Sequence, residues 1–535
     1  MARIIFGILG ALVVAVMVIG YGWPSALWGL PVLASLAALG VYDVYQKKRA
    51  LWRNYPIVGH LRMILERQRG PIRQYFAESD TDGRPFSREQ RSVVYARAKG
   101  EMDTLPFGTR HDLYAIGTEW IAHSMAPHEA PEVPPRVRIG GPECAHPYDA
   151  SFLNVSAMSF GSLSPAAVRA LNGGAAIGGF AQNTGEGGIS SHHLELGGDL
   201  IWQIGTGYFG CRTLDGAFDP EQFATRASLP QVKAIEVKIS QGAKPAHGGI
   251  LPAVKVSAEI GRIRGVRPGV DCISPARHTA FDSPRTMLLF LQRLRVLSGK
   301  PVGIKLCIGD WTDFFGICKA MHETGLPIDF ITVDGAEGGT GAAPLELTNS
   351  VGAPLTDGLL LVHDALTGFH LRTKTRIIAS GRIIMGFDMV QRIAIGADLC
   401  NAARGFLFSI GCIQALACNR NTCPTGVATQ NPNLARGLVV ADKKMRAANY
   451  HHATVRSFLE MVGVAGLEHP SDLRPWHIQR RVSPTEVQSY ARMHTYVEPG
   501  DFLRDKIPRA YEWPMKLSSP DAFGPKRRPL LVVQE

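Results

Sequence analysis

Cysteine is scarce in this sequence and forms no dense pattern. Nine cysteines are scattered over 535 residues without a regular framework. This odd number and spacing exclude a small fold held together by disulfides and are typical of free thiols in a reducing compartment. A long basic stripe interleaved with aromatic residues is also missing, although Lys and Arg outnumber Asp and Glu by 57 to 46. We therefore expect no nucleic-acid partner. Short-period repeats and low-complexity tracts are absent too. A chain of 535 residues is long enough for one large α/β domain with extensions or for several ordinary domains.

Charge is nearly absent from the first part of the chain, where two long apolar runs predict a membrane hairpin. Ile4 to Gly20 is an unbroken run of apolar residues and glycine, and Ala26 to Tyr42 is nearly another. Each run has about 17 residues, the short end of what a bilayer requires. The segment from Tyr21 to Pro24 between them has the aromatic and Pro/Gly character of an interfacial turn. A signal peptide is the alternative, but no clear small-residue cleavage site follows the first run.

Basic residues on both sides of this hairpin predict its orientation. Arg3 precedes it, and Lys47, Lys48, Arg49 and Arg53 follow it. The positive-inside rule then places both ends in the cytoplasm. We expect a protein of the cell inner membrane whose catalytic domain faces the cytoplasm.

The rest of the chain changes character twice. Charged helical signals are followed by Pro-rich sequence from Pro127 to Pro147, and then by short β-rich runs that alternate with Gly-rich turns and helix-length stretches. The predicted divisions are a transmembrane hairpin (1–50), a helical and Pro-rich connector (51–150), a barrel with a cysteine segment (151–430), and a C-terminal helical extension with a Lys/Arg-rich tail (431–535).

Eight β-rich runs predict eight parallel strands, which favours a (β/α)8 TIM barrel of the α/β class. The predicted strands are Phe152–Met158, Gly179–Asn183, Leu200–Ile204, Ala234–Ile239, Val302–Cys307, Phe330–Asp334, Arg376–Ser380 and Asp398–Ala402. In such a barrel the active site lies at the carboxyl ends of the strands.

Two glycine-containing turns and one lysine indicate a phosphorylated cofactor at that end. Gly381 follows the seventh strand and Arg404 follows the eighth, and these two loops frequently form a phosphate site in barrels. Ordinary βα turns remain the alternative. Lys305 interrupts an apolar strand, where it could stabilise negative charge on the pyrimidine edge of a reduced flavin. The alternative for Lys305 is a rim lysine whose head reaches water.

Two further polar loops, Asn183–Gly188 and Gly338–Ala342, follow the second and sixth strands. Several Gly-rich loops at one face reinforce one another as evidence for a binding site. Glu186 is the candidate for holding or protonating a substrate nitrogen, with a surface turn residue as the alternative. The string Gly205–Gly210 matches the spacing of a dinucleotide fingerprint, but Gly216 and Pro220 leave little room for the helix that such a fingerprint requires. We interpret it as a barrel loop.

Three cysteines close together predict an iron-sulfur cluster. Cys412, Cys418 and Cys423 lie within twelve residues, and a set of three thiolates suits a three-iron cluster or a four-iron cluster with one ligand from outside the protein. The spacing does not match structural zinc, which requires paired knuckles and four protein ligands. Three packed or free thiols are the alternative.

Five motifs occur in the order in which they are found in one enzyme family. Over residues 150 to 430 the chain resembles the FMN-binding synthase domain of glutamate synthase. The motifs are Ser156–Ser164, Asn183–Gly188, Gln241–Pro245, Gly338–Ala342 and Cys412–Gln430. The resemblance implies a (β/α)8 barrel that carries FMN and a 3Fe-4S cluster and reduces 2-iminoglutarate, made from 2-oxoglutarate and ammonia.

The resemblance also implies roles for individual residues. Substrate contacts are implied at Glu186, Lys244 and Arg264, and cluster ligation at Cys412, Cys418 and Cys423. The implied FMN contacts are Met158, Ser159, Asn183, Lys305, Gly339, Thr340, Gly341, Gly381 and Arg404.

The sequence departs from the family pattern in three places. Where the family usually has Gly-Glu-Gly-Gly-Gln-Leu-Pro-Gly after the Gln-Gly-Ala-Lys-Pro motif, this chain has His247 and Ile250 at the two polar positions. No segment resembles the glutaminase domain, so ammonia is expected from solution or from another subunit. The membrane hairpin is foreign to the soluble enzyme and indicates a shorter, anchored relative.

We therefore predict a membrane-anchored FMN and iron-sulfur oxidoreductase that makes L-glutamate by reductive amination of 2-oxoglutarate. A ferredoxin or a reductase subunit is the expected electron donor. Two alternatives stay open: an FMN-dependent oxidoreductase that acts on another amine or amino acid, and a membrane-bound electron-transfer subunit without chemistry of its own.

Overall fold

A computed structural model describes residues 2–524, so residues 525–535, which contain most of the predicted Lys/Arg-rich tail, lie outside the described part. The chain divides into two compact units, one ending at Arg88 and the other beginning at Glu89. The boundaries predicted at residues 50 and 150 remain predictions.

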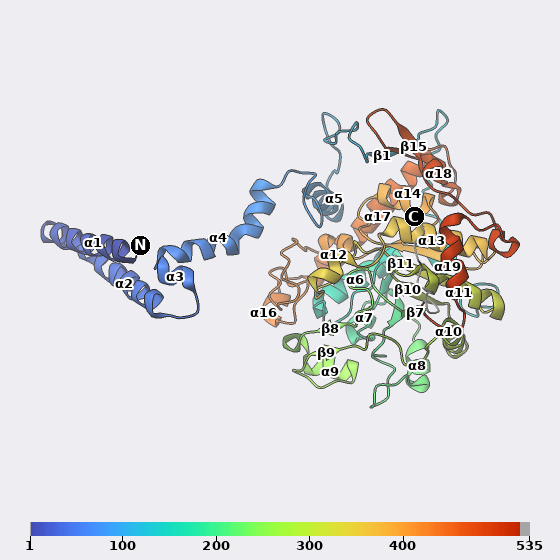
Figure 1. Ribbon diagram of the computed structural model, residues 1–535, viewed down its shortest axis with the longest axis horizontal. Coiled ribbons are helices and arrows are strands. Elements are labelled where there is room, and N and C mark those ends of the chain that lie inside the picture. Colours follow the sequence, from blue (N-terminus) through green and yellow to red (C-terminus); the bar gives the residue numbers. More distant parts are fainter. Residues whose placement is uncertain (1, 525–535) are drawn as a thin grey trace, which may run out of the picture. The chain divides into compact units, whose positions relative to one another are not determined.

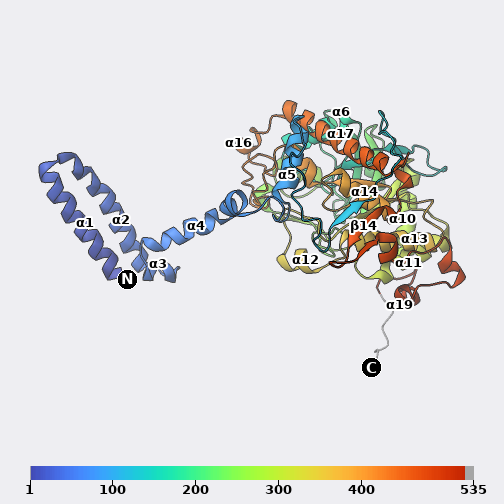
Figure 2. The same cartoon turned by 90° about the horizontal axis from the view of Figure 1, so that it is seen from above.

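The N-terminal unit consists of helices (Figure 2). They are α1 (Ala2–Gly22), the 3-10 helix η1 (Pro24–Trp28), α2 (Gly29–Tyr45), α3 (Ala50–Asn54), α4 (Val58–Ile72) and the π-helix η2 (Arg73–Ala77). Helices α1 and α2 lie side by side as a hairpin. The segments Ala2–Gly22 and Pro24–Tyr45 are both long and apolar enough to cross a membrane by length and composition.

The second unit is built around a closed barrel of eight parallel strands, which confirms the predicted fold class (Figure 1). Around the barrel the order is β4, β5, β6, β7, β10, β11, β12, β13, and β13 pairs with β4 to close it. The strands are β4 (Leu153–Val155), β5 (Ala181–Asn183), β6 (Asp199–Ile204), β7 (Val232–Lys238), β10 (Val302–Leu306), β11 (Phe330–Asp334), β12 (Arg376–Ser380) and β13 (Leu399–Ala402). Each of the eight predicted strands is therefore present.

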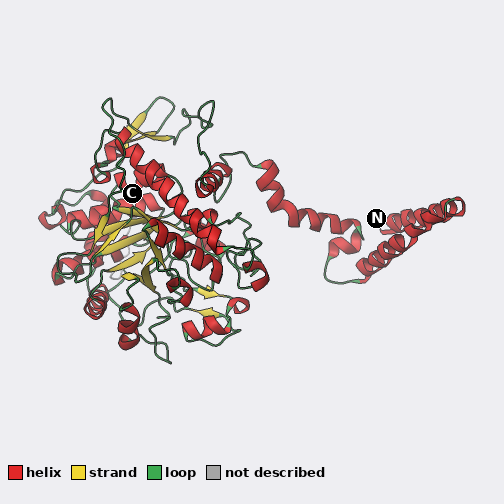
Figure 3. Ribbon diagram, turned by 180° about the vertical axis from the view of Figure 1, so that it is seen from behind, coloured by secondary structure: helices red, strands yellow, loops and turns green. Residues whose placement is uncertain are grey.

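Helices surround the strands, as Figure 3 shows in red around the yellow barrel. The main ones are α6 (Pro165–Gly178), α7 (Ser191–Leu194), α8 (Pro220–Ala227), α10 (Pro284–Ser298), α11 (Trp311–Thr324), α13 (Leu355–Gly368), α14 (Gly386–Ala394) and α15 (Arg404–Ser409). Several begin with a capping side chain: Ser164, Asp219 and Asp310 each accept hydrogen bonds from backbone N–H groups of the first turn. Local sequence thus starts these helices at the carboxyl ends of the strands.

A small hairpin closes the opposite end of the barrel. Strands β2 (Val137–Ile139) and β3 (Tyr148–Ala150) pair with each other, and Ile139 and Ala150 belong to a buried cluster with strand residues such as Ile201. Because apolar side chains fill this end, only the carboxyl ends of the strands are left to form a site.

Segments before and after the barrel cover its outside. The long helix α17 (Val440–Val464) packs on α6 and α14. The sequence did not reveal a three-stranded sheet of β1 (Glu119–Ile121), β14 (Ile478–Arg481) and β15 (Val487–Ser489). The remaining elements are α5 (Arg88–Lys99), β8 (Ile250–Leu251), η3 (Ala253–Lys255), α9 (Ala258–Arg264), β9 (Cys272–Ile273), α12 (Leu345–Ser350), α16 (Pro432–Ala435), η4 (Pro470–Asp472), η5 (Pro475–His477), α18 (Tyr490–Met493), η6 (Asp501–Arg504) and α19 (Arg509–Leu517).

Candidate active site at the carboxyl ends of the barrel strands

A buried carboxylate organises the interior of the barrel. Glu236 on β7 is fully buried and accepts hydrogen bonds from Asn183 on β5 (2.8 Å), Gln203 on β6 (2.6 Å) and Thr332 on β11 (2.6 Å). A buried charge is tolerated when such partners satisfy its oxygens. The network holds Asn183, a predicted cofactor contact, in place. Glu236 itself was missed in the sequence, where it is one acidic residue in a strand.

A second ion pair lies in the same interior. The Lys305 ammonium is 3.3 Å from Asp334, which also accepts hydrogen bonds from the Gly242 N–H and the Ser380 hydroxyl. Burial lowers the pKa of Lys305, but Asp334 and Glu236 outweigh burial and hold the pKa above its ordinary value. Lys305 is therefore a charged residue of the barrel interior, and its head does not reach water as a rim lysine would.

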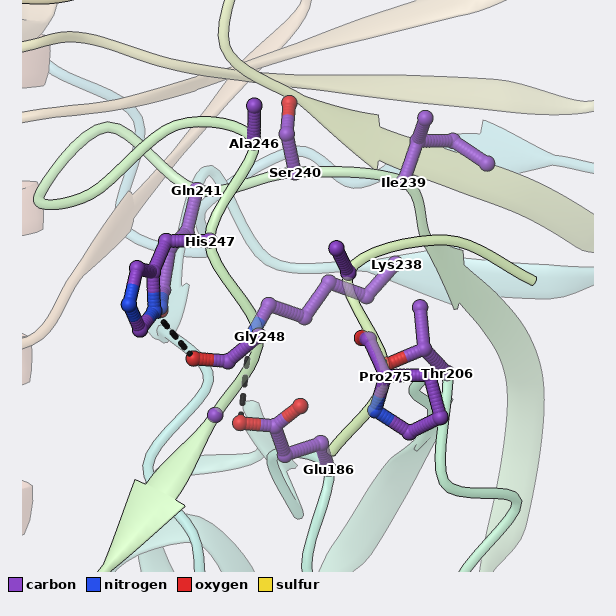
Figure 4. A pocket seen from close by; sticks show the side chains of 12 residues that line it. Glu186, Thr206, Lys238, Ile239, Ser240, Gln241, Ala246, His247, Gly248 and Pro275 are labelled. Atoms are coloured by element: carbon purple, nitrogen blue, oxygen red, sulfur yellow. Dashed lines mark hydrogen bonds and ion pairs between the residues drawn. The ribbon is translucent and has the colours of Figure 1, made fainter. Parts of the chain in front are cut away.

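Beside this interior a small pocket opens among the loops after β5, β6 and β7. Figure 4 shows Glu186 and Lys238 pointing toward each other across it, with 3.1 Å between the Glu186 carboxylate and the Lys238 ammonium. His247 lines the same pocket, and its Nδ1 lies 3.0 Å from the carbonyl oxygen of Gly248. The pocket thus joins a predicted residue, Glu186, to Lys238, which the sequence did not single out.

Two glycines make room for the Glu186 side chain. A Cβ atom at Gly249 would lie 2.2 Å from the Glu186 Oε1 atom, and a Cβ atom at Gly205 would lie 2.7 Å from the Glu186 Cβ. Any side chain at either position would displace the carboxylate. Gly205 begins the Gly205–Gly210 string, which lies in the loop between β6 and α8, as predicted.

Cations surround the Glu186 carboxylate. Burial raises the pKa of Glu186, but the charges of Lys238, Arg264 and Lys244 outweigh burial and hold the pKa below its usual value. Lys244 is almost fully buried and forms no ion pair among residues 2–524. Burial lowers the pKa of Lys244, and Glu186 opposes this effect only in part. The site therefore has positive charge in excess of its one carboxylate, which favours an anionic ligand.

Arg264, the third predicted substrate contact, lies behind the loop that carries Glu186. Its guanidinium donates to the carbonyl oxygen of Phe160 at 3.0 Å and lies over the Phe209 ring, with 5.1 Å between Cζ and the ring centroid. Arg264 is not among the residues that line the pocket. The structure brings Glu186 and Lys238 together at the pocket and places Arg264 in contact with the supporting loops.

The predicted cofactor residues come from loops at this same end of the barrel. Met158 and Ser159 contact the Asn183–Gly188 loop so closely that a Cβ at Gly185 would be 2.5 Å from the Ser159 nitrogen. Gly339, in the loop after β11, faces the guanidinium of Arg404, which would be 3.6 Å from a Cβ at this glycine. Thr340 is exposed beside Gly339, and a Cβ at Gly341 would be 3.5 Å from the Cβ of Cys418. Gly381 packs against Gly335 and Leu355.

Arg404 has no ion-pair partner among the described residues, and its side chain is partly exposed. An unpaired guanidinium beside a glycine loop has the donor chemistry that a phosphate group requires. The loops after β11 and β13 therefore fit a phosphorylated cofactor.

The three predicted cluster ligands occupy one loop but differ in environment. Burial raises the pKa of Cys412. The pKa of Cys423, in contrast, is lowered overall. The opposing effect of burial is outweighed by hydrogen bonds from the Ala428, Thr425 and Val427 N–H groups and from the Thr425 hydroxyl. Lys255 lies nearby and donates to the Ala428 carbonyl oxygen at 2.9 Å. A thiolate at Cys423 is the form that binds iron.

These thiols are not arranged around a metal. Within residues 2–524 no group of three His, Cys, Asp or Glu side chains could hold a metal ion, and all nine cysteines are free. The loop is strained, since Gln414, Leu416 and Asn421 all have positive φ angles (57°, 53° and 59°). The donor chemistry of the three thiols suits a cluster, and the ligand assignment stays a prediction.

Comparison with known proteins shows that the chain belongs to a known family. The model of the conserved region in glutamate synthase matches residues 145–468. The glutamate synthase large subunit-like protein YerD of Bacillus subtilis is 36% identical over 482 residues, which cover 82% of this chain and 91% of that protein. The archaeal glutamate synthase [NADPH] of Archaeoglobus fulgidus is 33% identical over 321 residues, and the chain spans only 60% of its length. A solved structure of a mutant flavocytochrome b2 with pyruvate bound is 12% identical, with a TM-score of 0.42, and the match covers 78% of this chain and 88% of that one.

Proposed function

This chain belongs to the glutamate synthase family and is an FMN oxidoreductase, and on that premise we propose that it makes L-glutamate by reductive amination of 2-oxoglutarate. Ammonia and 2-oxoglutarate would combine to 2-iminoglutarate, which a two-electron reduction converts to the amino acid. The observation that carries this proposal is the Glu186–Lys238 pair that lines the pocket, with the cations Arg264 and Lys244 close enough to lower the pKa of Glu186.

The charges of the pocket match a substrate with two carboxylates. Lys238 lines the pocket and would orient a carboxylate there, while Lys244 is buried outside the lining and adds positive charge near Glu186 without an ion pair of its own within residues 2–524. Glu186 is the group that exchanges a proton with the substrate nitrogen or holds the amine. Because cations keep its pKa low, Glu186 is an anion before substrate arrives and can accept a hydrogen bond from an ammonium or iminium N–H. Arg264 supports the loop of Glu186 from behind.

The residues proposed to hold FMN are Met158, Ser159, Asn183, Lys305, Gly339, Thr340, Gly341, Gly381 and Arg404. The fit rests on the unpaired Arg404 beside the Gly339 loop, which suits the phosphate, and on the charged Lys305 in the barrel interior. FMN supplies the hydride chemistry of the reaction when it is bound. Lys305 would stabilise negative charge on the ring, and Asp334 keeps Lys305 in position.

We also propose that Cys412, Cys418 and Cys423 bind a 3Fe-4S cluster, which would pass single electrons to the flavin. The support is the lowered pKa of Cys423 and the packing of Cys418 against the Gly341 loop, which brings the cysteine segment beside a proposed flavin contact. A ferredoxin or a reductase subunit is the proposed electron donor. Relatives are named for NADPH, but the Gly205–Gly210 loop opens no helix before Pro220 and lacks the geometry of a dinucleotide site.

The hairpin of α1 and α2 is proposed to anchor the protein in the cell inner membrane, with the barrel in the cytoplasm. The support is the length and apolar composition of both helices together with the basic residues that flank them. Ammonia would reach the site from solution or from another subunit.

A second substrate is favoured by one observation. His247 lines the pocket at a position where the family pattern has an acidic residue, and Ile250 replaces a polar one close by. An FMN-dependent reaction on another 2-oxo acid or amino acid would use the same Glu186, Lys238 and Lys244.

The experiment is a single-turnover assay on the anaerobically purified and reduced protein. Rapid reoxidation of the flavin on mixing with 2-oxoglutarate and ammonia, with formation of one glutamate per two electrons, supports the first substrate. Reoxidation only by another 2-oxo acid with ammonia supports the second. If no small molecule reoxidises the protein while an electron carrier does, the chain is an electron-transfer subunit and both substrate proposals are wrong.

A further inference from the structure

The segment that follows the hairpin has features of a surface-binding element. We propose that residues 47–73, here called the basic segment, bind the headgroups of anionic phospholipids, with helix α4 lying along the bilayer surface. This inference rests on the proposed membrane anchor, because a hairpin in the bilayer brings the basic segment to the headgroup region. It goes beyond an anchor, since it predicts a preference for one class of lipid.

Charge is the first argument. The basic segment has eight Lys and Arg residues and one acidic residue, Glu66. Lys47, Lys48, Arg62, Arg67 and Arg69 form no ion pair within residues 2–524, whereas Arg73 pairs with Glu78. Cations without a protein partner are free to pair with phosphate groups, and each one near an anionic surface adds to membrane affinity.

An apolar stripe on α4 is the second argument. Val58, Leu61, Leu65 and Ile72 recur at helical spacing and therefore lie along one side of the helix. Their exposed fractions are 56%, 57%, 54% and 44%. Arginines flank this stripe and occupy the other side. A helix with this pattern binds at a lipid interface, where the stripe enters the acyl region and the arginines reach the headgroups.

The start of α4 is fastened to the base of the hairpin, which is the third argument. Asp43, buried near the end of α2, accepts a hydrogen bond from the Ile57 N–H (2.9 Å) and contacts His60 Nε2 at 2.8 Å. Trp52 stacks on His60, with ring centroids 4.0 Å apart, and Arg49 lies over Trp52. Ile57 adopts a positive φ of 66°, which a β-branched residue accepts only when its surroundings require it. These contacts hold α4 at the hairpin end where Lys47 to Arg53 lie (Figure 2).

The test measures protection of the basic segment in lipid nanodiscs. The full-length protein is reconstituted in nanodiscs of phosphatidylcholine alone and of phosphatidylcholine with phosphatidylglycerol, and amide hydrogen exchange is followed. In anionic discs we expect exchange in residues 58–72 to slow by at least about tenfold relative to neutral discs. High salt should reverse this protection. The triple variant Arg62→Glu/Arg67→Glu/Arg69→Glu should lose it, and so should Leu61→Glu/Leu65→Glu.

A matched charge reversal on the second unit, Lys506→Glu/Arg509→Glu/Lys516→Glu, should leave the protection unchanged. Equal exchange in neutral and anionic discs, in a protein that has entered both, overturns the inference and leaves the anchor standing. A protein that remains outside both kinds of disc overturns the anchor itself, and the inference with it. Protection that is independent of lipid and of salt would mean that α4 packs on protein, which also contradicts the inference.

Discussion

The Glu186 pocket and the Cys412–Cys423 loop lie at the same end of the barrel, but the chain builds the first far more completely than the second. Glu186 is paired with Lys238 and is enclosed by glycines that leave space for it. The cysteine loop has three thiols in no metal-binding arrangement and three non-glycine residues at positive φ. Opposite charges stabilise the pocket, whereas the cysteines of the loop differ in environment: burial raises the pKa of Cys412, and at Cys423 burial is outweighed by hydrogen bonds that lower the pKa. The comparison teaches that an ion pair and close glycines preorganise the Glu186 carboxylate, while the three cysteine side chains are held by differing local contacts.

The largest expected effect is the loss of the iron-sulfur cluster from the cysteine loop while FMN stays bound. Cys418→Ser should abolish the iron-sulfur EPR signal and the iron content while most of the FMN is retained, because serine is a poor cluster ligand and the flavin loops do not depend on this thiol. Anaerobic purification with iron analysis and absorbance and EPR spectra measures this. Cys144→Ser is the control, since that thiol lies far along the chain beside Gly299. Full iron content in the Cys418 variant would show that this thiol is not a ligand.

The next effect concerns chemistry in the pocket. Glu186→Gln should lower kcat by about 10²–10⁴, the usual contribution of a positioned acid or base. FMN and iron contents should stay at wild-type levels, because the cysteine loop does not contact this side chain. Steady-state kinetics with reduced donor measures kcat, and Glu221→Gln on the exposed start of α8 is the control. A kcat within twofold of wild type would exclude Glu186 from the reaction.

A backbone change tests whether the pocket is preorganised. Gly249→Ala places a methyl group 2.2 Å from the Glu186 Oε1 atom and must displace the carboxylate. We expect kcat/KM to fall by about 10- to 100-fold with little change in melting temperature. Gly309→Ala is the matched control, because a Cβ there meets no atom within 4 Å. Unchanged kinetics in the Gly249 variant would mean that the position of Glu186 is not critical.

The smallest effect is a change in pH dependence. The pKa of Glu186 is lower in the folded protein than its ordinary value of 4.5, so its contribution to stability is present above pH 4.5 and is lost as the pH falls through the folded pKa. Lys238→Met removes the nearest cation and leaves burial less opposed, which raises this pKa. The fall in melting temperature below pH 4.5 should therefore be smaller in the variant than in wild type, because its folded pKa for Glu186 lies closer to, or above, the unfolded value. An unchanged profile, or an equal shift in the exposed Lys374→Met control, would contradict the proposed coupling.

How far the site could be predicted depended on whether a residue stands out from its own segment. Lys305 is a charge in an apolar strand and Glu186 lies in a Gly-rich loop, so both were found in the sequence. Glu236 and Lys238 lie in β7, where charged residues alternate with apolar ones, and they were missed because no single charge stands out there and the partners of Glu236 are remote: Asn183 is 53 residues away, and Thr332 is 96. The hydrogen bonds that make Glu236 a centre of the barrel arise only when β5, β7 and β11 face one interior.

The sequence alone determined the barrel and the apolar hairpin of helices. Strands buried on both faces are mostly apolar runs, and helices that cross a bilayer are mostly apolar over their whole length, so both patterns can be read from consecutive residues. Only the tertiary structure decided which charges meet: Glu186 with Lys238, and Lys305 with Asp334. The physical reason is that the strength of an ion pair depends on distance and burial, and neither exists until segments far apart in the chain have folded together.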